Sequence, residues 1–181
     1  RVTANDAPIG ILDAVRRAAD KVDIFAQAGQ VGIGIPPSAL VAFLEPMIHP
    51  VEVKRGIFHP KVWFLEYERG DERAYRFVCA SRNLTADRSW DVVISLDGTA
   101  ARPSERAAAR KINAPLVRLL RSLPEMSVRP VQRARRARIE ALTSRIRDVV
   151  WAPPEGMRDI RFHLWGVGER PQPAFWGVRG L

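Results

Sequence analysis

Residues 57–98, IFHPKVWFLEYERGDERAYRFVCASRNLTADRSWDVVISLDG, contain the pattern that decides the fold. Two runs rich in aromatic and β-branched residues, 62–67 and 75–80, are separated by a polar stretch that contains Gly70. Two such runs joined by a short glycine-containing turn are typical of an antiparallel β-hairpin. We therefore predict a hairpin here, followed by a third strand over residues 90–96.

Four polar side chains stand at the open end of this hairpin. His59 and Lys61 precede the first run, and Ser81 and Asn83 follow the second. Because side chains alternate between the two faces of an extended chain, His59 and Lys61 are expected on the same face. The hairpin returns the chain, so Ser81 and Asn83 are expected near His59. An imidazole nucleophile, an ammonium charge and neutral hydrogen-bond donors together suit a phosphate group.

The order His-x-Lys, strand, turn, strand, Ser-x-Asn resembles the active-site motif of the phospholipase D superfamily. The usual form of that motif is His-x-Lys-x4-Asp followed by Gly-Ser-x-Asn, whereas this chain has Glu66 at the acidic position and Ala80 at the glycine position. The long hairpin, the Tyr-Glu-x-Gly turn and the Asn-Leu that follows are more similar to the tyrosyl-DNA phosphodiesterase branch. Members of that branch lack the Asp, so Glu66 is expected among the supporting residues and need not be catalytic.

The resemblance implies a phosphodiesterase that needs no metal or other cofactor. One His attacks phosphorus and forms a phosphohistidine, while a second His, from a second copy of the motif, protonates the leaving oxygen and later activates water. In this chain the resemblance makes His59 the nucleophile, Lys61 and Asn83 phosphate clamps, and Ser81 a hydrogen-bond partner. His163 is followed two residues later by Trp165 rather than Lys, so it is not a second copy. We expect the second half-site to come from further C-terminal sequence, which we favour, or from a homodimer.

The excess positive charge is confined to residues 101–150. This segment contains 13 Lys and Arg against 4 Asp and Glu, which equals the net charge of +9 of the whole chain. We predict two helices in it, over residues 114–123 and 131–150. A solvated helix face is one explanation; we favour nucleic-acid binding through backbone phosphates. The candidate residues are Arg133, Arg135, Arg136 and Arg138.

Elements expected elsewhere complete an α/β pattern. We expect helices over residues 5–22 and 36–45 and strands over residues 22–26, 51–54 and 160–165, with a structural loop at the glycines of 29–35 and a further loop over 84–89. This order predicts a phospholipase D-like layered fold, with a mixed central sheet flanked by helices, as one lobe of a two-lobed enzyme. Residues 1–100 are expected to form that lobe, 101–150 a basic helical segment, and 151–181 a linker and the start of a further strand region.

Composition narrows the class of protein. No run approaches the length of a membrane span and no signal peptide is visible, and the one cysteine, Cys79, cannot form an internal disulfide. A reducing cytoplasm fits this composition best. The leading function is a nuclease acting on DNA or RNA, such as one of a restriction or defence system. Two alternatives stay open: a catalytically degenerate lobe that binds nucleic acid or dimerises, and a lipid phosphodiesterase, disfavoured because no interfacial helix with aromatic anchors stands out.

Overall fold

The computed structural model describes residues 13, 17–30, 44–54, 56–83, 89–164 and 166. Contacts divide the chain into two compact units. The N-terminal unit comprises Arg1–His59 and Leu123–Arg138, and the hairpin unit comprises Pro60–Ser122 and Ile139–Leu181. The basic segment 101–150 is therefore shared between the two units.

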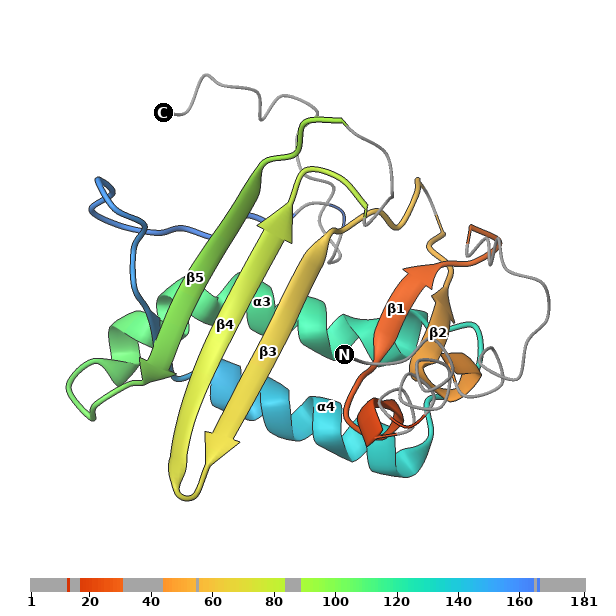
Figure 1. Cartoon of the computed structure of the whole chain (residues 1–181), viewed down its shortest axis with the longest axis horizontal. Helices are drawn as coiled ribbons and strands as arrows, with labels where there is room; N and C mark the ends of the chain where they lie inside the picture. Colours follow the sequence, from red (N-terminus) through yellow and green to blue (C-terminus); the bar gives the residue numbers. More distant parts are fainter. Residues whose placement is uncertain are drawn as a thin grey trace, which may run out of the picture. The chain divides into compact units, whose positions relative to one another are not determined.

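The hairpin unit contains a four-stranded antiparallel sheet. Its strands, in spatial order, are β3 (Val62–Arg69), β4 (Glu72–Ala80), β5 (Val93–Ala100) and β6 (Val149–Trp151). The predicted hairpin is confirmed: β3 and β4 pair from Val62↔Cys79 to Arg69↔Glu72 (Figure 1). The two residues between them turn the chain, with Gly70 at φ 59°, a left-handed conformation that glycine adopts without steric cost.

Two helices cover one face of this sheet. They are α3 (Arg106–Met126) and α4 (Arg133–Ile146), of which residues 106–122 and 139–146 belong to the hairpin unit (Figure 1). The predicted helix over 114–123 was too short, because α3 continues through Pro115. A proline inside a helix removes a backbone hydrogen bond and costs about 3 kcal/mol. Burial of five α3 side chains on the sheet side offsets this cost: Ala109, Asn113, Leu116, Val117 and Leu120.

A buried asparagine ties α3 to the last strand. Asn113 is fully buried; its Nδ2 donates to the Val149 carbonyl at 2.7 Å, and its Oδ1 accepts a hydrogen bond from Trp151 Nε1 at 2.7 Å. Trp151 was expected to begin a linker and instead ends β6. The strand expected over residues 90–96 runs instead from Val93 to Ala100, with Gly98 paired to Trp151 of β6. A Cβ at Gly98 would lie 2.5 Å from Val149 Cγ1, so the close approach of β6 requires glycine there.

The N-terminal unit contains a separate sheet of two parallel strands, β1 (Ile24–Gln27) and β2 (Ile48–Val51). The one-turn 3-10 helix η1 (Glu45–Met47) leads into β2. β1 lies close to its expected position, whereas β2 ends where a strand over 51–54 was expected to begin. The Val128 amide donates to the Pro50 carbonyl at 2.8 Å, so the connection after α3 packs beside β2.

The structure confirms the α/β class and corrects its details. In the part of the chain that the structure describes, the strands form one parallel and one antiparallel sheet rather than a single mixed sheet. β3 and β4 follow one another through a two-residue turn, which favours antiparallel pairing. Residues 160–164 form no strand. The expected helix over 5–22 is seen only at residues 13 and 17–19, while most of 36–45 and the loops 31–35 and 84–88 lie outside the described residues.

Candidate active site

Lys61 lies beside the end of β4. We expected His59 and Lys61 to share one face of a strand. The first strand of the hairpin begins at Val62, so both residues precede it. The Ala80 amide nevertheless donates to the Lys61 carbonyl at 2.9 Å. The antiparallel pairing therefore continues one residue beyond β3 and brings Lys61 next to the residue that precedes Ser81.

Ser81 is held by a network that the sequence analysis did not anticipate. Its amide donates to the Val92 carbonyl at 2.9 Å and to Asp91 Oδ1 at 3.1 Å. Its hydroxyl donates to the same carboxylate and accepts from the Val92 amide at 3.1 Å. The Ser81 hydroxyl is also the main reason why the pKa of Asp91 is lowered. Ser81 thus fixes the path of the chain as it leaves β4 toward Asn83.

His59 and Asn83 are both exposed. His59 is the final residue of the first segment of the N-terminal unit, and Lys61 is in the hairpin unit. One residue separates them, so their Cα atoms lie within about 7.6 Å by chain geometry alone. Asn83 is two residues beyond Ser81 and borders residues 84–88, which are outside the described part. That His59 and Asn83 share a pocket with Lys61 stays a prediction.

Glu66 has a structural partner. Its side chain is 17% exposed, and its Oε2 accepts a hydrogen bond from Arg145 Nη2 of α4 at 2.7 Å. Tyr75, the buried residue paired with Glu66 on β4, has a raised pKa. Burial is the main cause, and the negative charge of Glu66 is the second. Strand alternation puts Glu66 and Lys61 on opposite faces of the sheet, so Glu66 contributes to the packing of α4.

The arginines at the start of α4 differ in environment. Arg135 is 5% exposed, and Arg135 Nη1 and Arg138 Nη2 reach the Asp23 carboxylate at 3.0 and 2.6 Å. Burial alone would raise the pKa of Asp23, but hydrogen bonds from His49, Arg138 and Arg135 outweigh it and lower the pKa to about 2. Arg136 pairs with Glu125, while Arg133 is exposed. Arg135 and Arg138 therefore stabilise the N-terminal unit, a role that a run of arginines in a sequence does not reveal.

Comparison with protein-family models found no match, and comparisons with curated proteins and with solved structures found none either. Within the described ranges, no group of three or more His, Cys, Asp or Glu side chains is arranged to hold a metal ion. No helix in those ranges combines the length and apolar character needed to cross a membrane.

Proposed function

We propose that this chain carries one half-site of a phospholipase D-like phosphodiesterase that acts on nucleic acid through a phosphohistidine. The observation that supports the proposal most strongly is the pairing of Lys61 with Ala80. It brings the start of the hairpin, with His-x-Lys, next to its end, with Ser-x-Asn. The backbones of the two motifs thereby meet at one end of the sheet. Strand alternation turns the Lys61 and Ser81 side chains to opposite faces, so the proposal requires the chain after Ser81 to bring Asn83 back to the side of Lys61.

In the proposed reaction, a His59 ring nitrogen attacks phosphorus. A P–N bond forms, the P–O bond to the leaving group breaks, and the leaving oxygen keeps the electron pair of that bond. Lys61 and Asn83 hold the non-bridging oxygens and stabilise the negative charge that builds up on them. Ser81 acts as a positioning residue, since its hydroxyl is engaged by Asp91 and Val92. A general acid from a second half-site would protonate an ordinary alkoxide leaving group.

A half-site can be tested alone with a leaving group that needs no proton. Bis(p-nitrophenyl) phosphate releases p-nitrophenolate, so the first step requires only the nucleophile and the phosphate clamp. In excess EDTA, the chain is expected to release about one equivalent of p-nitrophenolate per active site in a burst, because hydrolysis of the intermediate lacks its general base. The protein should then carry a covalent p-nitrophenylphosphoryl group, which mass spectrometry would detect.

Matched variants separate chemistry from background. His59→Ala should abolish the burst and the adduct, whereas His163→Ala, which changes another exposed histidine, should retain both. Lys61→Arg should slow the burst, because a planar guanidinium does not replace a compact ammonium at a tight phosphate site. Lys54→Arg is the matched lysine control. Release that survives His59→Ala, or that requires added Mg²⁺, would disprove the proposal.

A further inference from the structure

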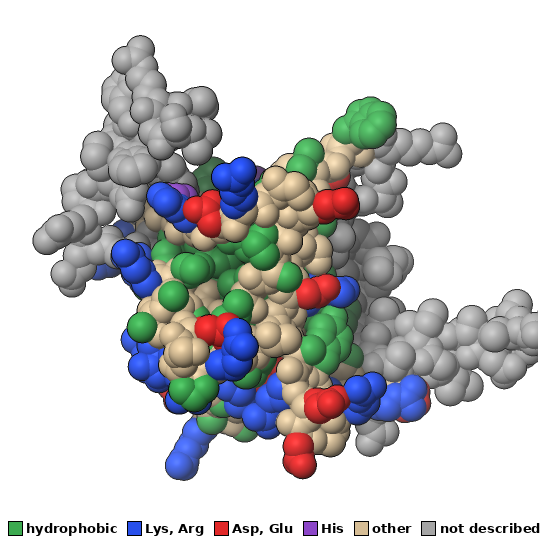
Figure 2. All heavy atoms as spheres, turned by 90° about the vertical axis from the view of Figure 1, so that its left-hand side faces the viewer, with side chains coloured by type: hydrophobic (Ala, Val, Ile, Leu, Met, Phe, Trp, Pro, Cys, Tyr) green, Lys and Arg blue, Asp and Glu red, His purple; other side chains and the backbone are tan. Residues whose placement is uncertain are grey.

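The face of the four-stranded sheet opposite the helices is rich in aromatic and apolar side chains. Alternation along β3 puts Trp63, Leu65 and Tyr67 on this face, and pairing brings Val78, Arg76 and Ala74 opposite them on β4. Trp63 is 45% exposed and Tyr67 is 50% exposed. Figure 2, which views the molecule from the side of β5, shows exposed hydrophobic side chains among charged ones beside the edge of the sheet. We call the sheet face defined by Trp63, Leu65, Tyr67, Arg76 and Val78 the outer sheet face.

The outer sheet face is in line with the candidate active site. Because the Lys61 carbonyl pairs with the Ala80 amide, alternation continues back to Lys61 and puts it on the side of Trp63. Residues two apart along a strand are separated by about 7 Å. The row therefore starts at Lys61, just before β3, and continues along β3 through Trp63 and Leu65 to Tyr67. It consists of an ammonium group and then two aromatic rings, with Leu65 between the rings.

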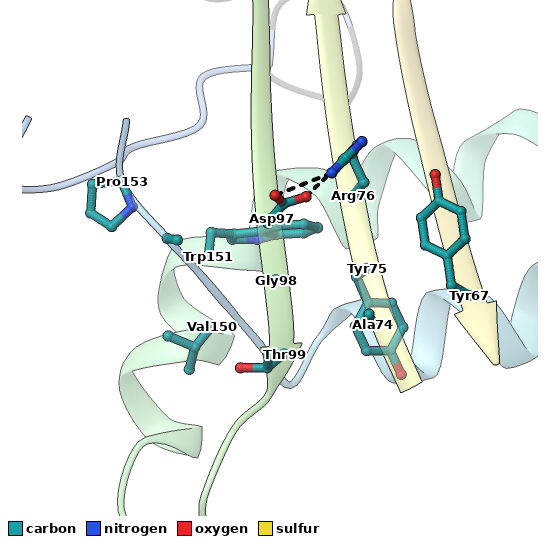
Figure 3. Close-up of a pocket in the computed structure, with 11 residues that line it drawn as sticks. Tyr67, Ala74, Tyr75, Arg76, Asp97, Gly98, Thr99, Val150, Trp151 and Pro153 are labelled. Carbon is teal, nitrogen blue, oxygen red and sulfur yellow. Dashed lines mark hydrogen bonds and ion pairs between the residues drawn. The ribbon is translucent and has the colours of Figure 1, made fainter. Parts of the chain in front are cut away.

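An open pocket of about 590 Å³ lies at the far end of this row. Figure 3 shows Tyr67 on one side and Val150 and Pro153 on the other, with Arg76 and Asp97 between them. Arg76 Nε donates to Asp97 Oδ1 at 2.7 Å, and Nη2 donates to Oδ2 at 3.2 Å. The pocket thus combines an aromatic wall with a donor and an acceptor, which is the chemistry that recognises a planar heterocyclic base.

We propose that the outer sheet face binds single-stranded nucleic acid, with bases stacked on Trp63 and Tyr67 and the backbone directed toward Lys61. Aromatic side chains on a sheet bind unpaired bases because every base has an exposed π-face, whereas a duplex hides those faces. The row of rings begins at Lys61, which the proposed function assigns to a phosphate, so a nucleic-acid strand bound there would extend along the outer sheet face. Arg76 is paired with Asp97 and adds little net charge to this face. This inference rests on the proposed function and defines its substrate class as single-stranded.

Fluorescence anisotropy at fixed salt, with labelled oligothymidylate, oligouridylate and a DNA duplex of equal length, tests the proposal. Both single strands are expected to bind more tightly than the duplex; a preference for one of them would identify DNA or RNA as the natural ligand. Trp63→Ala and Tyr67→Ala should each weaken single-strand binding about tenfold. Trp63→Phe should restore most of the affinity, since a phenyl ring still stacks.

Trp90→Ala is the matched control, because Trp90 is 98% exposed and precedes β5 rather than lying on the sheet. It should leave the affinity unchanged. Equal or tighter binding of the duplex, or full affinity in Trp63→Ala and Tyr67→Ala, would overturn the inference. So would a dimer in analytical ultracentrifugation that Trp63→Ala dissociates, since the outer sheet face would then be a protein interface.

The two proposals fail in different ways. His59→Ala removes the nucleophile and should keep single-strand binding. Single-strand binding that depends on Trp63, without a p-nitrophenolate burst, would support binding by the outer sheet face and reject the proposed phosphodiesterase reaction. A burst that depends on His59, together with binding that does not depend on Trp63, would reject only the outer sheet face.

Discussion

Two groups of basic residues, one on α3 and one on α4, have different surroundings. At the start of α4, Arg135 and Arg138 hold a buried carboxylate, that of Asp23. On α3, Lys111, Arg118 and Arg121 are exposed, and none of them forms an ion pair with a carboxylate in the described ranges. The comparison shows that density of arginine does not reveal function. The position of an opposing carboxylate decides whether an arginine stabilises the protein or can contact a ligand.

Loss of Arg135 should produce the largest effect. Arg135→Ala leaves the buried Asp23 carboxylate without one of its partners, and breaking a buried ion pair costs about 3 kcal/mol or more. Urea denaturation would measure the free energy of unfolding. Arg133→Ala, at an exposed position in the same helix, should change it by less than about 0.5 kcal/mol. Equal losses in the two variants would contradict the structural role of Arg135.

The second prediction concerns the pH dependence that Asp23 introduces. Its pKa is lowered from 3.8 to about 2, so its contribution to stability is present above pH 3.8 and is lost as pH falls through 2. Wild type should therefore lose about 2 kcal/mol relative to Asp23→Asn over this window. Denaturation curves of both proteins at several pH values would measure the difference. Asp159→Asn, an exposed control, should show the same pH dependence as wild type. If the difference in free energy of unfolding between wild type and Asp23→Asn did not change with pH, the lowered pKa of Asp23 would be refuted.

The smallest effect per residue is expected for the exposed group on α3. If Lys111, Arg118 and Arg121 contact phosphates, replacing each by Gln should reduce the slope of log affinity against log salt by up to about one unit. Titration of a labelled oligothymidylate over a series of NaCl concentrations would measure this slope. Arg138→Gln, in folded protein, should leave the slope unchanged. The reverse pattern would return the nucleic-acid contacts to α4, where the sequence analysis placed them.

The hairpin is the part of the fold that could be predicted from local sequence. Alternating aromatic and β-branched residues and a glycine turn depend on neighbours within about ten positions, and β3 and β4 lie where this pattern puts them. The helices were predicted in kind but not in extent. Local rules accept Pro115 only in the first turn of a helix, as in the predicted helix that begins at residue 114, yet contacts of Asn113 with Val149 and Trp151, more than thirty residues away, hold α3 through it.

For the candidate site, local sequence was enough to select His59, Lys61, Ser81 and Asn83 as residues of interest, since their spacing around a hairpin is a one-dimensional pattern. Their surroundings depended on the three-dimensional structure. Asp91 accepts a hydrogen bond from Ser81, Arg145 pairs with Glu66, and Asp23 pairs with the buried Arg135. These partners are between ten and 112 residues apart in the sequence. Periodicity and composition describe a residue and its near neighbours in the sequence. Packing between distant segments decides which carboxylate lies opposite a buried arginine.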